Sequence, residues 1–323
     1  MDELLLRDLI IRRIPEINSR EQILLYKKFD REEGLSILSK GVVEDILGRK
    51  LLRVSGHMDD LREQAEEDIR IMRIRGIGCV SFISSHYPPL LRELYDPPAL
   101  VFYRGVLPDP ERPLVAVVGT RRPTAAAVSQ AYVIGKALAE AEIPVVSGLA
   151  LGIDAMAHRG NLEGGAPTVA VLGSSPDEVY PGTNRALARR IIDQGGVILS
   201  EYPPGTGPRK WNFPARNRII SGLARGTVIV EAPVSSGALI TARFALEQGR
   251  DLWVTSSGVN STRGEGTRKL AEEGARVISG AAEILREWGI VLEKTPEEVF
   301  PQNRSPQGAM LASSLARKLN IDL

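Results

Sequence analysis

The chain has 323 residues and a formal net charge of +1, and 43% of its residues are hydrophobic while 25% are charged. These proportions are ordinary for a globular protein of about two domains. They exclude a uniformly basic surface, so an anion-binding site must come from cations that are placed locally. The single cysteine, Cys79, excludes a disulfide framework and a zinc site built from cysteines. An acidic start and the lack of an apolar run of about 20 residues predict a cytoplasmic protein with no membrane contact.

Residues 1–75 are predicted to form a helical N-terminal domain. Leucines and isoleucines recur there at roughly helical spacing, and glycines and a proline interrupt the pattern. Within this domain, the highly charged segment 59–73 predicts an amphipathic helix with a solvated face. Residues 76–108 contain two Pro-Pro pairs and short apolar runs, and we expect a connector that packs on the next domain.

From residue 109 to residue 290, short apolar runs alternate with helical patterns. Apolar strands that alternate with helices predict a mostly parallel sheet covered on both faces. The fold class is therefore α/β, with a Rossmann-like, doubly wound sheet in which ligands bind beyond the carboxyl ends of the strands. The predicted strands are Leu114–Val118, Ile143–Val146, Thr168–Leu172, Val197–Leu199, Thr227–Val230 and Leu252–Thr255. Residues 291–323 are predicted to be a short tail without a complete winged helix.

The stretch KWNFPARNRIISG, which begins at Lys210, carries the strongest functional signal. Pro214 is suited to open a helix, which would place Arg216 and Arg218 in its first turn. The helix dipole is positive at that end and disfavours cations, so the arginines indicate an anionic ligand. A single nucleic-acid strand fits, because its phosphates would meet the cations and a base would stack on Phe213. A surface charge cluster is the competing interpretation.

Small residues follow two of the predicted strands at positions suited to phosphate. Gly119, Thr120 and Arg121 come after the first strand, and Ser236 and Gly237 precede a later helix. Backbone N–H groups at such helix starts favour anions, although ordinary capping explains the Ser236 loop almost as well. The sequence has neither a dinucleotide-binding GxGxxG motif nor a P-loop, which argues against NAD binding and ATP hydrolysis.

Glu201 and Glu231 end two strands that we expect to be neighbours in the sheet. A pair of carboxylates is suited to acid–base chemistry. No nucleophile motif accompanies them, so a protein without catalytic activity or cofactor is the favoured prediction. Asp154 and His158 are expected to have structural roles in one helix.

Six motifs occur in the order typical of the DNA-processing protein A family (DprA/Smf), which the chain resembles over residues 80–280. They are Gly119-Thr120-Arg121; Ser147-Gly148-Leu149-Ala150 with Gly152-Ile153-Asp154 and Ala157-His158; Val171-Leu172-Gly173 with Tyr180-Pro181 and Asn184; Ser200-Glu201-Tyr202-Pro203; Phe213-Pro214 with Arg216-Asn217-Arg218-Ile219-Ile220 and Gly222-Leu223; and Val230-Glu231-Ala232 with Ser236-Gly237-Ala238-Leu239 and Thr241-Ala242.

The resemblance implies a non-enzymatic, homodimeric protein that binds single-stranded DNA, protects it and loads the RecA recombinase in natural transformation and recombination. It also implies that residues 1–75 are a degenerate SAM- or helix-hairpin-helix-like domain, because Ile14–Asn18 lacks the expected glycines. The family's DNA-binding positions match Arg121, Lys210, Phe213 and Arg218. Our candidate DNA-binding residues are Gly119, Thr120, Arg121, Lys210, Phe213, Arg216, Asn217, Arg218, Ser236 and Gly237.

The alternative is an enzyme on the same fold, a nucleotide-processing protein that resembles the phosphoribohydrolases. Those enzymes carry a Pro-Gly-Gly-x-Gly-Thr run with a glutamate shortly after it. The nearest equivalent in this chain, Ser236–Thr241, supplies no acid. A third interpretation is a scaffold for the recombination machinery that contacts DNA only incidentally.

Overall fold

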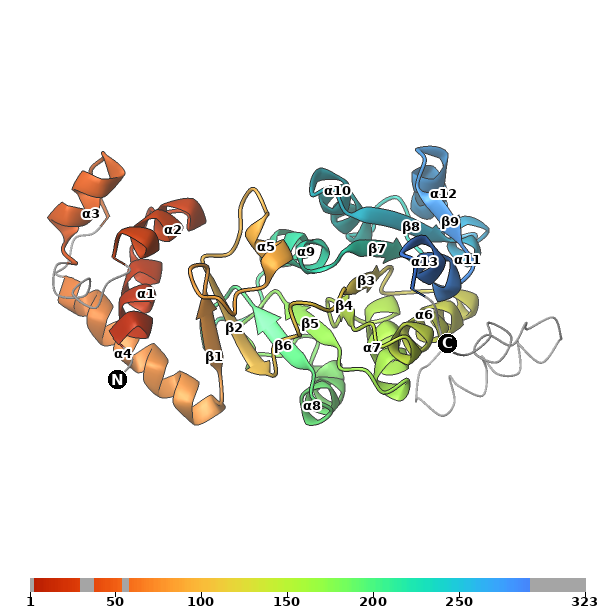
Figure 1. Cartoon of the computed structure of the whole chain (residues 1–323), viewed down its shortest axis with the longest axis horizontal. Coiled ribbons are helices and arrows are strands. Elements are labelled where there is room, and N and C mark those ends of the chain that lie inside the picture. The colour runs from red at the N-terminus through yellow and green to blue at the C-terminus, as the bar shows by residue number, and fades with distance from the viewer. Residues whose placement is uncertain (1–2, 30–37, 54–57, 291–323) are drawn as a thin grey trace.

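The computed structural model describes residues 3–29, 38–53 and 58–290. A group of helices, α1–α4, lies at one end of the molecule beyond strand β1 (Figure 1). Its buried side chains form one cluster with Leu100 and Phe102 of the adjoining sheet, so these helices pack on the sheet edge. The helices are α1 (Glu3–Arg13), α2 (Ser19–Lys28), α3 (Lys40–Leu47) and α4 (Met58–Arg75).

The described strands form a single nine-stranded sheet in the order β1-β2-β6-β5-β4-β3-β7-β8-β9. β1 and β2 pair antiparallel with each other, β2 pairs antiparallel with β6, and the other pairs are parallel. The predicted connector therefore extends the sheet with two strands of its own. The strands are β1 (Gly78–Ser81), β2 (Leu100–Gly105), β3 (Val115–Val118), β4 (Val145–Ser147), β5 (Val169–Leu172), β6 (Val197–Ser200), β7 (Gly226–Ile229), β8 (Asp251–Thr255) and β9 (Arg276–Ile278).

The strand order reverses beside β3. From β3 the chain builds outward through β4, β5 and β6, and it then returns to the opposite side of β3 to form β7. Loops that leave β3 and β7 diverge at this point, which is where doubly wound sheets hold their ligands. The reversal also separates Glu201, after β6, from Glu231, after β7, by three strands. Our expectation that these glutamates end neighbouring strands is wrong, because the return crossover skips the strands already laid down.

Helices cover both faces of the sheet, as the sequence predicts. One face packs against α5 (Pro89–Arg92), α9 (Asn212–Leu223), α10 (Ala238–Glu247) and α12 (Glu265–Glu272). The other face packs against α6 (Ala125–Glu140), α7 (Ile153–Glu163), α8 (Arg185–Asp193) and α13 (Ala281–Glu287). A short helix, α11 (Ser256–Val259), and a 3₁₀ turn, Gly182–Asn184, complete the described elements.

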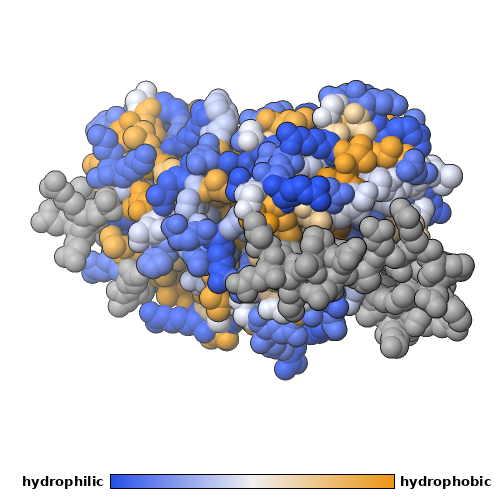
Figure 2. Space-filling view, turned by 45° about the vertical axis from the view of Figure 1, so that its right-hand side comes forward, coloured by the Kyte–Doolittle hydropathy of each residue, from blue (hydrophilic) through white to orange (hydrophobic). Residues whose placement is uncertain are grey.

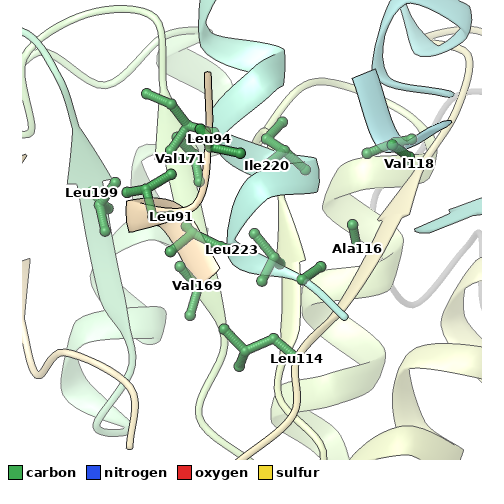
Figure 3. Close-up of a cluster of buried hydrophobic side chains, with 14 of the residues drawn as sticks. Leu91, Leu94, Leu114, Ala116, Val118, Val169, Val171, Leu199, Ile220 and Leu223 are labelled. Carbon is green, nitrogen blue, oxygen red and sulfur yellow. The ribbon is translucent and has the colours of Figure 1, made fainter. Parts of the chain in front are cut away.

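Side-chain alternation along the central strand builds the two cores. Ala116 and Val118 of β3 point into the cluster under α9, whereas Val115 and Val117 point into the cluster under α6. Figure 3 shows the first cluster, where side chains from α5 and α9 meet those of β3, β5 and β6. Because both faces of the central strands are buried, these strands are apolar throughout, which is why they stand out in the sequence.

Hydrophilic residues cover most of the described surface in Figure 2, and apolar residues emerge between them in separate patches. Among the described residues, no helix is both long and apolar enough to cross a membrane. The predicted tail, residues 291–323, and the expected absence of a winged helix lie outside the described residues.

Candidate nucleic-acid interface

An open groove of about 1020 Å³ lies at the strand-order reversal, beyond the carboxyl ends of β3 and β7. We call it the sheet-edge groove. Its walls come from segments 118–122, 210–220, 233–241 and 262–263, with Ala150, Asp154 and Tyr180 beside them. Every candidate residue that the sequence indicated lines this groove except Arg218. Loops that are far apart in sequence therefore converge where the fold class predicts a ligand.

An aromatic surface and a guanidinium meet inside the sheet-edge groove. The ring of Phe213 lies 5.5 Å from that of Tyr180, centroid to centroid, with an interplanar angle of 51°. The Arg121 Cζ atom lies 5.8 Å from the Phe213 centroid. Gly173 makes room for this arrangement, since a Cβ there would lie 3.0 Å from the Phe213 ring. The half-buried ring is thus held in place while one part of it faces the groove.

Helix α9 begins two residues earlier than Pro214 predicts. Its first residue is Asn212, whose side-chain amide donates to the carbonyl of Gly173 at 2.9 Å. Pro214 is the third helical residue, where its missing N–H still costs no intrahelical bond. Arg216 and Arg218 consequently lie beyond the first turn, so the prediction that they occupy it is wrong. Their roles follow from burial and partners rather than from the helix dipole.

Arg216 is a buried structural cation, although it borders the groove. It is only 5% exposed, and its Nη1 atom donates to the carbonyl oxygens of Gly148, at 3.0 Å, and of Val171. Burial lowers its pKa to about 10, which leaves it charged at neutral pH. Asp154 lies on the same side of Gly148, where a Cβ would be 2.6 Å from Nη2 of Arg216 and 2.7 Å from Oδ2 of Asp154, and it accepts from the backbone N–H of Gly148 at 3.1 Å. Arg216 thus ties the loop after β4 and strand β5 to α9.

Arg218 lies outside the sheet-edge groove and contacts the protein itself. Its side chain is 12% exposed and forms an ion pair with Glu201 at 2.7 Å, while its Nε donates to the carbonyl of Asp96 at 3.0 Å. Residues two positions apart on an α-helix point about 200° apart, so Arg216 and Arg218 cannot share one face. The expectation that Arg218 holds a phosphate in this groove is therefore not supported by its position.

Close packing leaves no room for a side chain at Gly119, in the loop after β3. A Cβ at Gly119 would lie 2.6 Å from Cγ1 of Ile153 and 2.9 Å from the carbonyl oxygen of Glu231. The start of α6 is capped from within, because the Glu231 carboxylate accepts from the backbone and hydroxyl of Thr124 at 3.0 and 2.6 Å. The helix-end N–H groups that we expected to favour phosphate at this loop are thus partly satisfied by the protein.

The loop before α10 is more open than the loop before α6. Gly237 precedes the helix without a side-chain capping bond, and no atom lies within 4 Å of the position of a Cβ on it. Asn217 bridges to this loop, since its amide donates to the carbonyl of Gly237 at 3.2 Å. Ser236 and Gly237 line the groove. The first N–H groups of α10 are nevertheless bonded within the loop, because Ala238 donates to the Ser236 hydroxyl at 3.3 Å, and Leu239 and Ile240 donate to the carbonyls of Ser236 and Gly237 at 3.1 Å.

Tyr180, Arg122 and Arg263 also line the groove and were not among the predicted DNA-binding residues. Tyr180 follows β5, Arg122 follows Arg121, and Arg263 follows β8. Arg263 reaches across the groove, where its Nη1 donates to the carbonyl of Arg122 at 3.1 Å. Each residue follows a parallel strand, so the carboxyl-end rule was the available signal.

The charge of the groove is strongly positive within the described residues. Arg121, Arg122, Lys210 and Arg263 are exposed there, whereas the acidic side chain that lines it, Asp154, is buried beside Arg216. A chain of near-neutral net charge thus gathers its cations locally, as its composition requires.

His158 has a structural position on α7, where it is fully buried and its Nδ1 lies 2.8 Å from the hydroxyl of Thr168. Burial, with a smaller contribution from Arg216, lowers its pKa from 6.5 to about 3. Between these two values the unfolded chain binds the proton and the folded chain does not, so stability falls as the pH decreases. We expect a loss of about 2 kcal/mol from pH 7 to pH 5.

Urea unfolding of the wild type and of His158→Asn at both pH values measures this loss. The wild-type free energy of unfolding should fall more steeply with pH than that of the variant. An equally steep fall in both proteins would show that other groups cause the acid sensitivity.

A family model described as DNA recombination-mediator protein A matches residues 78–289. The chain belongs to this family. The resemblance inferred from the six motifs is confirmed, and the match spans the whole sheet from β1 to β9. A role in DNA processing and recombination follows at the level of the family.

Relatives from several bacteria support the assignment. The DNA processing protein DprA of Streptococcus pneumoniae is 40% identical over 64% of this chain and 73% of its own length. DprA of Bacillus subtilis is 34% identical over 86% of this chain and 94% of the relative. The protein Smf of a Synechocystis strain is 43% identical over 68% of this chain, but the chain spans only 56% of that relative.

Solved structures confirm the fold. The X-ray structure of DprA from S. pneumoniae has a TM-score of 0.73 and 32% identity, and the match covers 86% of this chain and 95% of that one. A structure that describes the single-stranded DNA binding mode of DNA processing protein A from Helicobacter pylori has a TM-score of 0.57 and 31% identity, with 66% of this chain and 95% of that chain covered.

Proposed function

We propose that the chain binds single-stranded DNA in the sheet-edge groove and catalyses no reaction on it. The observation that carries the proposal is the meeting, in one open groove, of exposed cations with the Phe213 and Tyr180 rings. Cations suit the phosphates, and an aromatic face suits an unpaired base of any sequence. The H. pylori relative, described as binding single-stranded DNA, supports the same ligand class.

Each wall of the groove has a part in this proposal. Arg121, Arg122 and Arg263 lie where they would neutralise phosphates near the β3 and β8 loops, and Lys210 does so at the start of α9. The hydroxyl of Ser236, which lines the groove, adds a donor before α10. One base would stack on Phe213. These contacts do not read base edges, so we expect weak sequence preference.

Duplex DNA should bind less well than a single strand. The bases of a duplex are stacked on each other, and their faces cannot reach Phe213 without unpairing. The phosphate contacts are common to both forms, so the aromatic contact makes the difference. Preference for single strands is thus a consequence of the ring rather than of the charges.

The carboxylates offered for acid–base chemistry are engaged in structural contacts. Glu201 pairs with Arg218, and Glu231 accepts from Thr124 and from the hydroxyl of Ser261 at 2.7 Å. This favours a binding protein over the phosphoribohydrolase-like alternative. Release of free base from a nucleoside monophosphate by the purified chain would instead support the enzyme.

Loading of RecA onto the bound strand, action in natural transformation and assembly into a homodimer complete the proposal. The description of the family as a DNA recombination mediator supports the part in recombination. Two linked grooves in a dimer would raise affinity through effective concentration, since each protomer contributes only a few phosphate contacts.

Titration with a fluorescent oligonucleotide, single-stranded against double-stranded, at several salt concentrations tests DNA binding. Four phosphate contacts predict a log–log slope of about −3 for the single strand, at about −0.7 per contact. Arg263→Ala should reduce the slope by about one contact. Arg70→Ala is the matched control, because Arg70 is exposed on α4 and pairs with Glu67. Equal affinity for both DNA forms, or binding insensitive to salt, would contradict the proposal.

A further inference from the structure

Trp211 is an exposed indole beside the groove. It is 69% exposed, whereas Trp253 is buried and Trp288 packs against it with ring centroids 5.7 Å apart. These are the three tryptophans of the chain. A single exposed apolar residue is normal on a protein surface, so exposure alone does not indicate a function for Trp211. The position of the residue and its neighbours must indicate one.

The position of Trp211 is one where local structure favours a different residue. It is the residue that precedes the first turn of α9, and it forms no side-chain capping bond there. Serine, threonine, aspartate and asparagine stabilise this position by accepting from the helix, and tryptophan cannot. Neither burial nor capping therefore accounts for an indole at this position.

The chain around Trp211 is held firmly and points the ring outward. The next residue, Asn212, is buried and its amide bonds to the carbonyl of Gly173. The preceding residue, Lys210, lines the sheet-edge groove, and consecutive Cα atoms lie about 3.8 Å apart. Trp211 thus follows a groove-lining residue directly in the chain, and the buried Asn212 separates it from Phe213.

The charges beside Trp211 indicate which class of ligand would bind there. Arg209 lies with its Cζ atom 5.8 Å from the indole centroid, and Lys210 is exposed next to it. The stretch from Pro203 to Asn217 contains no acidic residue. A flat ring flanked by two cations fits a nucleobase with its phosphates better than it fits an apolar protein surface.

We propose that Trp211 is a second base-stacking residue, placed outside the sheet-edge groove, which holds a nucleotide where the DNA strand leaves it. This inference rests on the proposed function and extends it, because it directs the strand past the start of α9 as it leaves the groove. A short oligonucleotide that fills only the groove does not reach Trp211, and a longer one does.

Binding of oligothymidylates from about 4 to about 16 nucleotides, the range of site sizes of single OB-fold domains, tests the inference. Trp211→Ala should bind the longest oligonucleotides roughly 5- to 150-fold more weakly than the wild type and the shortest ones equally well. Trp211→Phe should retain most of the affinity, because the ring is kept. Tyr95→Ala is the matched control, since Tyr95 is 83% exposed beneath Arg20 and does not line the groove.

Intrinsic fluorescence gives a second readout that does not depend on affinity. A stacked base should quench Trp211, while the sheltered Trp253 and Trp288 should not respond. The quench should be present with long oligonucleotides and absent in Trp211→Phe. It should also decrease when the base over the indole is replaced by an abasic site.

The outcomes separate the two proposals. If the wild type binds every length and Trp211→Ala binds each one equally well without a change in fluorescence, Trp211 stacks no base and only this inference fails. If Trp211→Ala instead changes the oligomeric state in sedimentation, the indole is a protomer contact and the inference is again overturned. If the wild type binds no oligonucleotide, the proposed function fails with it.

Discussion

The Arg216→Ala variant should unfold about 3–5 kcal/mol more easily than the wild type, which is the largest effect we expect of any single substitution. The guanidinium is buried and bonds to the carbonyl oxygens of Gly148 and Val171, with the Asp154 carboxylate on the same side of Gly148. Its removal leaves those carbonyls without their donor and the carboxylate without its counter-charge. Urea unfolding followed by circular dichroism measures the loss.

Two further variants distinguish this explanation from a general sensitivity to arginine loss. Adding Asp154→Asn to Arg216→Ala should restore part of the stability, because no uncompensated charge is then left in the interior. Arg189→Ala should change stability by less than about 0.5 kcal/mol, since its side chain is 85% exposed on α8. If Arg216→Ala is as stable as the wild type and binds DNA more weakly, the structural explanation is wrong. Arg216 would then be a phosphate-binding residue, as the sequence predicts.

The sequence was sufficient to predict the sheet because burial on both faces makes its strands apolar without interruption. Leu114–Val118 and Thr168–Leu172 were placed within one residue of β3 and β5. The strand order was not accessible in the same way. Neighbouring strands of a parallel sheet need not be consecutive in the chain, so Glu201 and Glu231 were paired wrongly.

The types of the residues were sufficient to predict the sheet-edge groove. The wrong predictions concern the directions of individual side chains. Phe213 and Lys210 line the groove as expected. Arg216 and Arg218 carry the same charge two positions apart, so only a fixed helical register shows that one is buried and the other pairs with Glu201. Composition cannot supply that register, and Pro214 suggested a helix start two residues too late.

Arg263 shows a different limit of the sequence. It lies between α11 and α12, beyond the carboxyl end of β8, and β8 lies beside β7 in the sheet. No local pattern marks it as a ligand residue. A rule that considers every loop at the carboxyl edge of the sheet, rather than the glycine-rich ones alone, would have included it.

Phe213→Ala should weaken binding of single-stranded DNA by about 1–3 kcal/mol while leaving duplex binding nearly unchanged. The ring supplies the face on which we place one base, and a duplex cannot use it. Phe213 also packs on Gly173 and Tyr180, so Phe213→Leu serves as the control that keeps apolar packing without the aromatic face. Anisotropy titrations with single-stranded and duplex oligonucleotides measure both affinities.

Arg121 should be coupled to Phe213 in this measurement, because its guanidinium lies 5.8 Å from the ring centroid. Arg121→Ala should weaken both DNA forms through the lost phosphate contact. In the double variant the loss should be smaller than the sum of the single losses by about 0.5–1 kcal/mol, since one guanidinium orders the ring that it covers. Folded variants that each bind single-stranded DNA as tightly as the wild type would show that the strand lies elsewhere, however well the groove suits it.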